Sequence, residues 1–198
     1  MKLTQTILAC SLAVLALACQ ASNTSQTLPA YTPDIAVTKA PYTDVAANWK
    51  QRLDQPYVYL THRGDYRLAG QRFGELSSLM AGQGLEASGP PFALFYDDPA
   101  EVPLDELRSR LCLPVATPVT PEGDCSYAVL PSTTVVYAVV AGPYPEVPRA
   151  YPGLYSYLNS MHWIENGPIR EIYLVRPEAG KDWDELLCEI QIPATQRR

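Results

Sequence analysis

The chain has 198 residues, of which 47% are hydrophobic and 18% are charged, and its formal net charge is −6 at pH 7. This length supports one compact unit with a real core and is too short for two large independent domains. The acidic balance argues against binding to the phosphate backbone of nucleic acids, so no nucleic-acid partner is expected.

The first 18 residues predict a signal peptide for export. Lys2 precedes an uncharged apolar run from Ile7 to Ala18, which is too short for a stable membrane-spanning helix. Residues 15–19, Leu-Ala-Leu-Ala-Cys, resemble a bacterial lipobox, in which the cysteine after the cleavage site receives the lipid. Ordinary signal-peptidase cleavage after Ala18 is the alternative. We expect a lipoprotein anchored at Cys19 and, because Gln20 follows it, located at the outer membrane facing the periplasm.

Residues 19–54 predict a lipid-attachment site, a tether and a short accessory helix. Residues 20–42 are rich in Ser, Thr, Ala and Pro and have little periodic apolar signal, which is typical of a tether. Thr43 or Asp44 is a suitable cap for a helix that carries Val45, Trp49 and Leu53 and ends at Pro56.

The remainder of the chain contains the same pattern twice. Residues 58–114 are echoed by residues 136–193 at an offset of 78, which becomes 79 after one residue inserted beyond Pro177. Matched pairs include Val58-Tyr59 with Val136-Tyr137, Gly64 with Gly142, Tyr66 with Tyr144, Gly89-Pro90 with Gly167-Pro168, and Asp105-Glu106-Leu107 with Asp184-Glu185-Leu186. Agreement over so many positions predicts an internal duplication.

Both copies predict the same four elements. A strand (57–61 and 134–140) is followed by a helix (68–81 and 147–161) and two further strands (92–96 and 107–115; 170–175 and 186–192). We therefore predict an α+β fold in which two βαββ modules, at 55–116 and 126–194, form antiparallel sheets about a pseudo-twofold axis, with one main helix per module. The crevice between the modules is the natural ligand site.

Several motifs in these copies carry a family resemblance. Gly142-Pro143-Tyr144, Tyr151-Pro152-Gly153-Leu154, Glu165-Asn166-Gly167-Pro168, Glu171-Ile172-Tyr173 and residues 188–193 resemble the GyrI-like small-molecule-binding domain, which is also the effector-binding domain of AraC-type and MerR-type regulators. Residues 89–99 resemble a branch with a Tyr-Asp-Asp-Pro turn. The resemblance covers about residues 55–194 and implies a mostly apolar pocket between the repeats that binds hydrophobic, often cationic, compounds; some members are hydrolases. The chain leaves no room for a helix-turn-helix, so we do not expect transcriptional control.

Glu171 is the strongest single candidate for the site. Its equivalent in the first copy is Ala93, so the duplication makes this charge asymmetric. Strand alternation places Glu171 and Tyr173 on one face, where the carboxylate can attract a cation or have a raised pKa. The alternative is a surface glutamate paired with Arg170 or Arg176.

Aromatic residues suggest the lining of the pocket. Thirteen tyrosines and three tryptophans stand against three phenylalanines, and tyrosine suits flat or cationic ligands through stacking and cation–π contacts. The expected ligand-binding residues are Tyr59, Tyr96, Tyr137, Tyr144, Tyr155, Trp163, Glu171 and Tyr173. Taken singly, each aromatic residue is also explained by the core or rim of a small sheet protein.

Cysteine and histidine patterns do not predict a metal or a cofactor. The mature chain would retain Cys112, Cys125 and Cys188 beyond the lipid site; an oxidising compartment permits one disulfide, and the register favours Cys112 with Cys188 while leaving other pairings open. There is no Cys-x-x-Cys motif, and the two histidines stand alone, so zinc and thiol-redox chemistry have no local support.

Three functions remain as hypotheses. The leading one is an envelope-tethered binding protein for small hydrophobic or cationic molecules. The second is a hydrolase in which Glu171 acts as acid or base with Tyr144 nearby. The third is an envelope scaffold that presents its aromatic residues to a protein partner. Whether catalysis occurs is uncertain, and the ligand and the oligomeric state are not predicted.

Overall fold

The computed structural model describes residues 32–175, 182 and 185–197. The predicted signal peptide, the lipid site Cys19 and the first part of the tether lie outside the described residues. Among the residues that are described, no helix is long and apolar enough to span a membrane.

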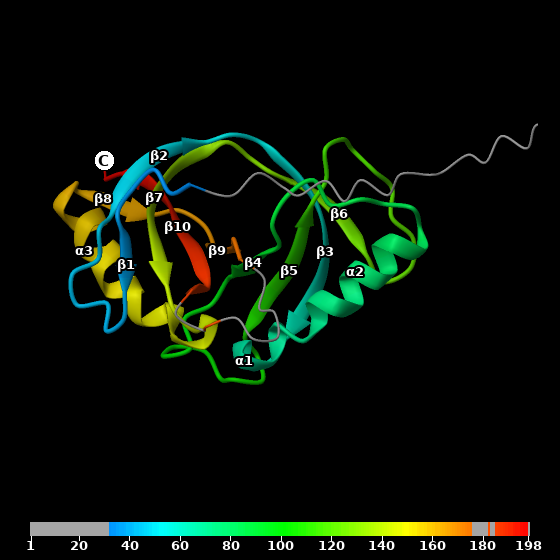
Figure 1. The fold of residues 1–198 in the computed structure, drawn as a ribbon, viewed down its shortest axis with the longest axis horizontal. Coiled ribbons are helices and arrows are strands. Elements are labelled where there is room, and N and C mark those ends of the chain that lie inside the picture. Colours follow the sequence, from blue (N-terminus) through cyan, green and yellow to red (C-terminus); the bar gives the residue numbers. More distant parts are fainter. Residues whose placement is uncertain (1–31, 176–181, 183–184, 198) are drawn as a thin grey trace, which may run out of the picture. The chain divides into compact units, whose positions relative to one another are not determined.

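The described residues form one large mixed sheet with helices (Figure 1). In chain order the elements are β1 (Val37–Lys39), β2 (Asn48–Arg52), β3 (Gln55–Arg63), α1 (Tyr66–Ala69), α2 (Arg72–Gly82), β4 (Phe92–Phe95), β5 (Arg108–Pro114), β6 (Ser126–Leu130), β7 (Thr133–Ala141), the 3-10 helix η1 (Tyr144–Ala150), α3 (Tyr151–Ser160), β8 (Trp163–Glu165), β9 (Ile169–Tyr173) and β10 (Leu187–Gln196).

The two modules meet at the centre of the sheet. The strand order is β1-β7-β10-β9-β4-β5-β3-β6, so the second module (β7, α3, β9, β10) occupies one half and the first module (β3, α2, β4, β5) the other. They are joined by the antiparallel pair β4–β9. Figure 1 shows these two strands in the middle, between α3 at one end and α2 at the other.

The register of β4 against β9 places the pseudo-twofold axis at one residue pair. Ala93 lies opposite Glu171, and these two residues are also equivalent by the sequence offset of 78. A position that faces its own equivalent across an antiparallel pair lies on the axis that relates the two copies. Glu171 therefore places a carboxyl group at the pseudo-twofold axis, where the first module has an alanine.

Backbone hydrogen bonds repeat between the modules at the same offsets. The amide of Gly64 donates to the carbonyl of Leu107 at 2.8 Å, and the amide of Gly142 donates to that of Leu186 at 3.0 Å. Both glycines have φ values, 122° and 147°, that disfavour other residues. Both modules contain the same turn, and its backbone geometry requires a glycine at this position in each.

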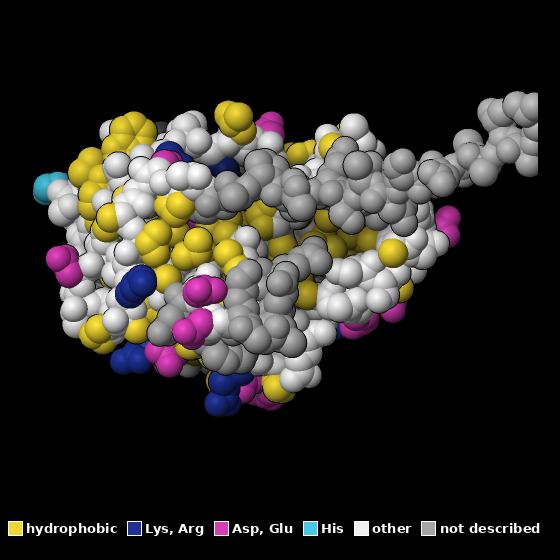
Figure 2. Space-filling view, in the orientation of Figure 1, with side chains coloured by type: hydrophobic (Ala, Val, Ile, Leu, Met, Phe, Trp, Pro, Cys, Tyr) yellow, Lys and Arg dark blue, Asp and Glu magenta, His cyan; other side chains and the backbone are white. Residues whose placement is uncertain are grey.

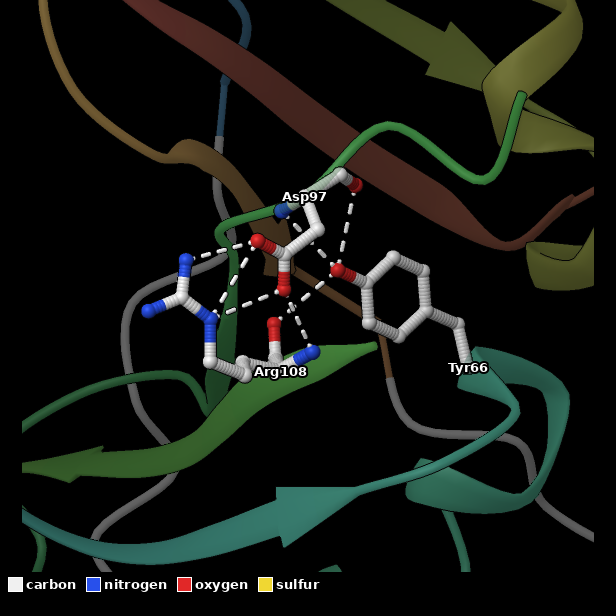
Figure 3. A network of polar contacts seen from close by, with 3 residues as sticks. All are labelled: Tyr66, Asp97 and Arg108. Carbon is white, nitrogen blue, oxygen red and sulfur yellow. Dashed lines mark hydrogen bonds and ion pairs between the residues drawn. The ribbon is translucent and has the colours of Figure 1, made fainter. Parts of the chain in front are cut away.

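A tyrosine clamp also occurs in both modules. The hydroxyl of Tyr66 donates to the carbonyl oxygens of Asp97 at 3.1 Å and Arg108 at 2.9 Å, and Asp97 forms an ion pair with Arg108 (Figure 3). The hydroxyl of Tyr144 likewise contacts the carbonyl oxygens of Val175 and Leu187. Each clamp ties the start of the helical segment to the turn between the last two strands of its module.

Both main helices cover the same face of the sheet, one over each half. α2 buries Leu76 and Met80 against β3 and β5, and α3 buries Leu154 and Leu158 against β7 and β10. Helix-face residues of the strands include Leu60 and Ile190, and Glu171 lies directly opposite Ile190. Glu171 consequently points to the helix-bearing face, where the gap between α2 and α3 lies above it.

The predicted accessory helix is wrong. Residues 48–52 form the strand β2, which pairs antiparallel with β7 and places Trp49 opposite Val136. Trp49 and Leu53, the expected buried face of a helix, are 48% and 76% exposed. The unpaired edge of β7 offers backbone hydrogen bonds that override a weak helical pattern in so short a segment.

The predicted disulfide is also wrong, because Cys112, Cys125 and Cys188 are all free and buried. Cys112 belongs to β5 and packs with Phe92, whereas Cys188 belongs to β10 and packs in the cluster under α3. Three strand spacings separate the two strands, or about 14 Å, which exceeds the reach of a disulfide. The equivalent strands of two modules lie on opposite sides of the axis, so matched registers do not imply contact.

Candidate functional site

A cleft of about 1290 Å³ lies between the two helical segments. One wall comes from α1, α2 and the turn after β4; the other comes from η1, α3 and the loop before β9, and β9 supplies Glu171 and Tyr173. In the face shown in Figure 2, hydrophobic side chains gather over the middle, between the ends that carry α3 and α2. The cleft is thus a concave space of ligand size at the junction of the modules.

A carboxylate held by two tyrosines lies in the cleft. The hydroxyl of Tyr151 donates to Oε1 of Glu171 at 2.6 Å, and the hydroxyl of Tyr173 donates to Oε2 at 2.9 Å. Tyr151 begins α3, and Tyr173 lies two residues beyond Glu171 on the same face of β9. Both carboxylate oxygens are therefore positioned before any ligand arrives.

Burial controls the charge of this carboxyl group. Glu171 is 3% exposed, and burial raises its pKa to about 7, while the two tyrosine hydroxyls act in the opposite direction. Burial and the neighbouring carboxylate also raise the pKa values of Tyr151 and Tyr173, so both remain hydroxyl donors. Near neutral pH the site can hold or release a proton at Glu171 with little change in free energy.

The equivalent positions of the first module are all apolar. At an offset of 78, Phe73 corresponds to Tyr151, Ala93 to Glu171 and Phe95 to Tyr173. Phe73 and Phe95 line the opposite side of the same cleft, and the Phe73 ring meets the Tyr173 ring edge to face at 5.6 Å. At these three positions the second module therefore presents hydroxyl groups and a carboxyl group, whereas the first module presents only apolar side chains.

Acidic residues outnumber basic ones in the cleft. Among the described residues that line it, Glu165, Asp97, Asp98 and Glu101 accompany Glu171, and Arg67 is the one cation; Asp97 is paired with Arg108. Arg67 is paired with Asp65, and Glu165 accepts a hydrogen bond from Tyr155 at 2.8 Å. The surplus of carboxylates gives the cleft a potential that favours cations.

Five of the eight expected ligand-binding residues border the cleft: Tyr96, Tyr144, Tyr155, Glu171 and Tyr173. The other three lie elsewhere. Tyr59 contacts Arg110, and Tyr137 contacts Lys50, on the face away from the helices, while Trp163 meets the exposed ring of Trp49. Strand alternation separates Tyr59 and Tyr137 from the cleft, since neighbouring residues of each strand pack under the helices.

Tyr144, which was expected near Glu171 in an enzyme, lines the same cleft, but its hydroxyl makes its hydrogen bonds elsewhere. Its hydroxyl contacts the carbonyl oxygens of Val175 and Leu187 in the clamp described above. Tyr151, which was not among the expected ligand-binding residues, donates to Glu171. Comparing the copies position by position would have found it, because Tyr151 replaces Phe73 as Glu171 replaces Ala93.

Within the described ranges, no three His, Cys, Asp or Glu side chains are grouped so as to hold a metal ion.

Comparison with known proteins agrees with this geometry. The model of the GyrI-like small-molecule-binding domain matches residues 48–195. The chain belongs to this GyrI-like family. No curated protein sequence matches it.

Solved structures show the same fold. The crystal structure of the EcmrR C-terminal domain matches with a TM-score of 0.69 and 20% identity, covering 76% of this chain and 98% of that one. EcmrR in its DNA complex matches with a TM-score of 0.68 and 20% identity over 76% of this chain, which spans 57% of the EcmrR chain. An uncharacterised conserved protein from Listeria innocua matches with a TM-score of 0.59 and 11% identity, covering 77% and 93%. The predicted α+β fold of two repeated modules is confirmed.

Replacing Glu171 with Gln is expected to change how stability depends on pH. In the folded protein the pKa of Glu171 is about 7, above its ordinary value of 4.5. As pH rises, the Glu171 carboxyl therefore ionises in the unfolded chain before it ionises in the folded protein. The loss of unfolding free energy that Glu171 causes is absent below pH 4.5 and reaches its full value above pH 7. From pH 4.5 to 8, Glu171→Gln should gain about 3 kcal/mol in unfolding free energy relative to the wild type, measured by urea denaturation.

Glu165→Gln is the matched control, because Glu165 is exposed at the rim and also accepts a tyrosine hydrogen bond. Its unfolding free energy relative to the wild type should stay within about 0.5 kcal/mol over the same range. Parallel pH profiles for wild type and Glu171→Gln would show that Glu171 is already ionised at acidic pH.

Proposed function

We propose that this protein binds small hydrophobic cations in the cleft between its modules. The observation that carries the proposal is the asymmetric pair on the axis: a buried, hydroxyl-bonded Glu171 in one half and apolar side chains at the equivalent positions of the other.

The two halves of the cleft suit two parts of one ligand. A positive centre beside Glu171 favours the ionised carboxylate and lowers its pKa, so the cation and the deprotonated form stabilise each other. Tyr173 and Tyr144 present aromatic rings on this side, and each cation–π contact is worth about 0.5 to 2 kcal/mol. Phe73 and Phe95 can take apolar substituents on the other side.

Relatives support a ligand of this class. SAV2435, solved bound to tetraphenylphosphonium, matches with a TM-score of 0.50 and 14% identity, covering 75% of this chain and 93% of that one. That likeness concerns the fold, and the ligand belongs to SAV2435. The preference for a cation in this chain is argued from its own carboxylates.

Two probes of nearly equal shape and opposite charge test the proposal. Tetraphenylphosphonium should bind at pH 8, whereas tetraphenylborate should bind at least tenfold more weakly, because the acidic cleft repels it. Binding of tetraphenylphosphonium should weaken by about tenfold or more between pH 8 and pH 5, as Glu171 takes up its proton. Isothermal titration calorimetry measures both effects.

In the Glu171→Gln protein, tetraphenylphosphonium binding should lose most of its pH dependence, and the preference for tetraphenylphosphonium over tetraphenylborate should decrease. The Glu165→Gln protein should retain both properties. Equal affinity of the wild type for the two probes, or no binding of either, would rule out a cleft selective for cations.

Hydrolysis is the less supported alternative. Two further Listeria innocua structures described as hydrolases share the fold with a TM-score of 0.54 and at most 13% identity, which carries no information about chemistry here. A carboxyl group with a pKa of about 7 is suited to acid–base work. Both of its oxygens, however, accept tyrosine hydroxyls, and this arrangement is equally suited to stabilising a bound cation. The aromatic side chains line a concave cleft, which also favours a ligand over a flat protein contact.

We further propose that the binding unit works in the cell envelope, tethered by a lipid at Cys19. The support is the lipobox-like sequence of residues 15–19 after an apolar run. A Cys19→Ser protein should move from the membrane fraction to the soluble fraction, and its N-terminal peptide should lose the mass of the acyl chains. A wild type found in the soluble fraction with an unmodified N-terminus would contradict the tether.

A further inference from the structure

The face of the sheet away from the helices holds a cluster of positive charge. Strand alternation brings Arg170 of β9, Arg110 of β5 and Lys50 of β2 to this face, and Arg52 contributes to the positive charge around Arg170. This concentration is unusual in a chain whose net charge is −6. None of these four side chains takes part in the cleft around Glu171.

Arg170 is the centre of this cluster and is 4% exposed. Its guanidinium stacks on Phe92 at 4.0 Å and donates to the side-chain oxygens of Gln55 and, at 3.4 Å, Gln191. Its Nε is buried without a hydrogen-bond partner. The groups that contact this guanidinium are neutral, and the nearby charge of Glu189 offsets only part of the cost of burial, because the pKa of Arg170 stays lowered.

Arg52 increases this cost, and Arg110 lies on the same face. Arg52 donates to the carbonyl of Pro131 at 2.8 Å and, like Arg170, has a buried Nε without a partner. Its charge joins burial in lowering the pKa of Arg170 to about 10. Arg110 donates to the hydroxyl of Tyr57 at 3.0 Å and lies 4.2 Å from the centre of the Tyr59 ring.

Carboxylates on this face are already committed elsewhere. Glu189 forms an ion pair with Lys50 at 2.7 Å and accepts from Gln191, and its charge acts on Arg170 less strongly than burial and Arg52 do. Over the described part of the chain, Arg52, Arg110 and Arg170 have no ion pair with any carboxylate. Arg52 bonds to Pro131, whose neighbour Leu130 pairs with Gln55, a partner of Arg170. The two arginines thus lie in one region, each with an unpartnered Nε, and guanidinium groups recognise carboxylate and phosphate oxygens in pairs.

We propose that this second face binds a small oxyanion, a phosphate or a carboxylate group, between Arg170 and Arg52. Arg52 and Arg110 are only half-buried and give the anion access from solvent. The protein then has two sites of opposite charge preference on the two faces of its central strands, and adjacent residues, Arg170 and Glu171, serve one each.

Inorganic phosphate is the direct probe, and sodium chloride at matched ionic strength is the reference. At ten times its Kd, phosphate should raise the Tm of the full chain by about 3 °C more than chloride does. Acetate serves as the second arm: an equal effect identifies a carboxylate site, and a smaller one favours phosphate. Calorimetric titration gives the Kd for each anion.

Arg170→Met keeps an apolar stem on Phe92 and removes the charge, and it should weaken phosphate binding more than tenfold. Arg149→Met is the control, because Arg149 is an exposed arginine paired with Glu146 on η1; it should bind phosphate like the wild type. Arg52→Met provides a second test should Arg170→Met fail to fold. Glu171→Gln should leave phosphate binding unchanged, which separates this site from the cleft.

Two results would overturn the proposal. The first is a wild type that phosphate stabilises no more than chloride does and that gives no heat of binding. The second is an Arg170→Met or Arg52→Met protein that phosphate stabilises as much as it stabilises the wild type, because that effect would come from general exclusion of phosphate from protein surfaces.

Discussion

The antiparallel pairing of β4 with β9 is the interaction on which the rest of the molecule depends. It joins two βαββ modules, each with a half-sheet and one main helix, into a single sheet. It also leaves a gap between the two helices on one face, and the cleft occupies this gap. Because Ala93 and Glu171 face each other across the pair, the axis of the duplication passes through the residue with the most perturbed carboxyl group in the cleft.

The two modules share the residues that form their turns but differ in the residues that line the cleft. The tyrosine clamps and the glycine turns recur because each module must close its own turn with the same geometry. The cleft residues differ because a ligand with one charged centre needs one charged partner. A second glutamate at position 93 would place two buried carboxyl groups side by side, and their repulsion would keep one of them protonated. An alanine there leaves the charge of Glu171 without a like-charged neighbour on the axis.

The sequence was sufficient to predict the modules, since their strands and helices have strong periodicity and were seen twice. Residues 48–52 were misassigned because a short segment takes its structure from the sheet edge that it meets, and this partner is remote in sequence. Glu171 was identified by contrast with Ala93, whereas Tyr151 was missed because the same contrast with Phe73 was not drawn for the helix. Tyr59 and Tyr137 were assigned to the cleft from composition, although the face on which each lies depends on the strand register. Cys112 and Cys188 were paired by register, which says nothing about distance across the axis.

The central claim is that Glu171 exchanges its proton for a cation, and the titration of this one carboxyl tests it most directly. Carbon-13 NMR of protein labelled at the glutamate side-chain carboxyl can follow it, with Glu171→Gln to assign the signal. We predict a midpoint near pH 7 in the free protein and a midpoint lower by about one pH unit or more when tetraphenylphosphonium saturates the cleft. A midpoint near 4.5 in the free protein, or one that does not move when the cation binds, would contradict the account.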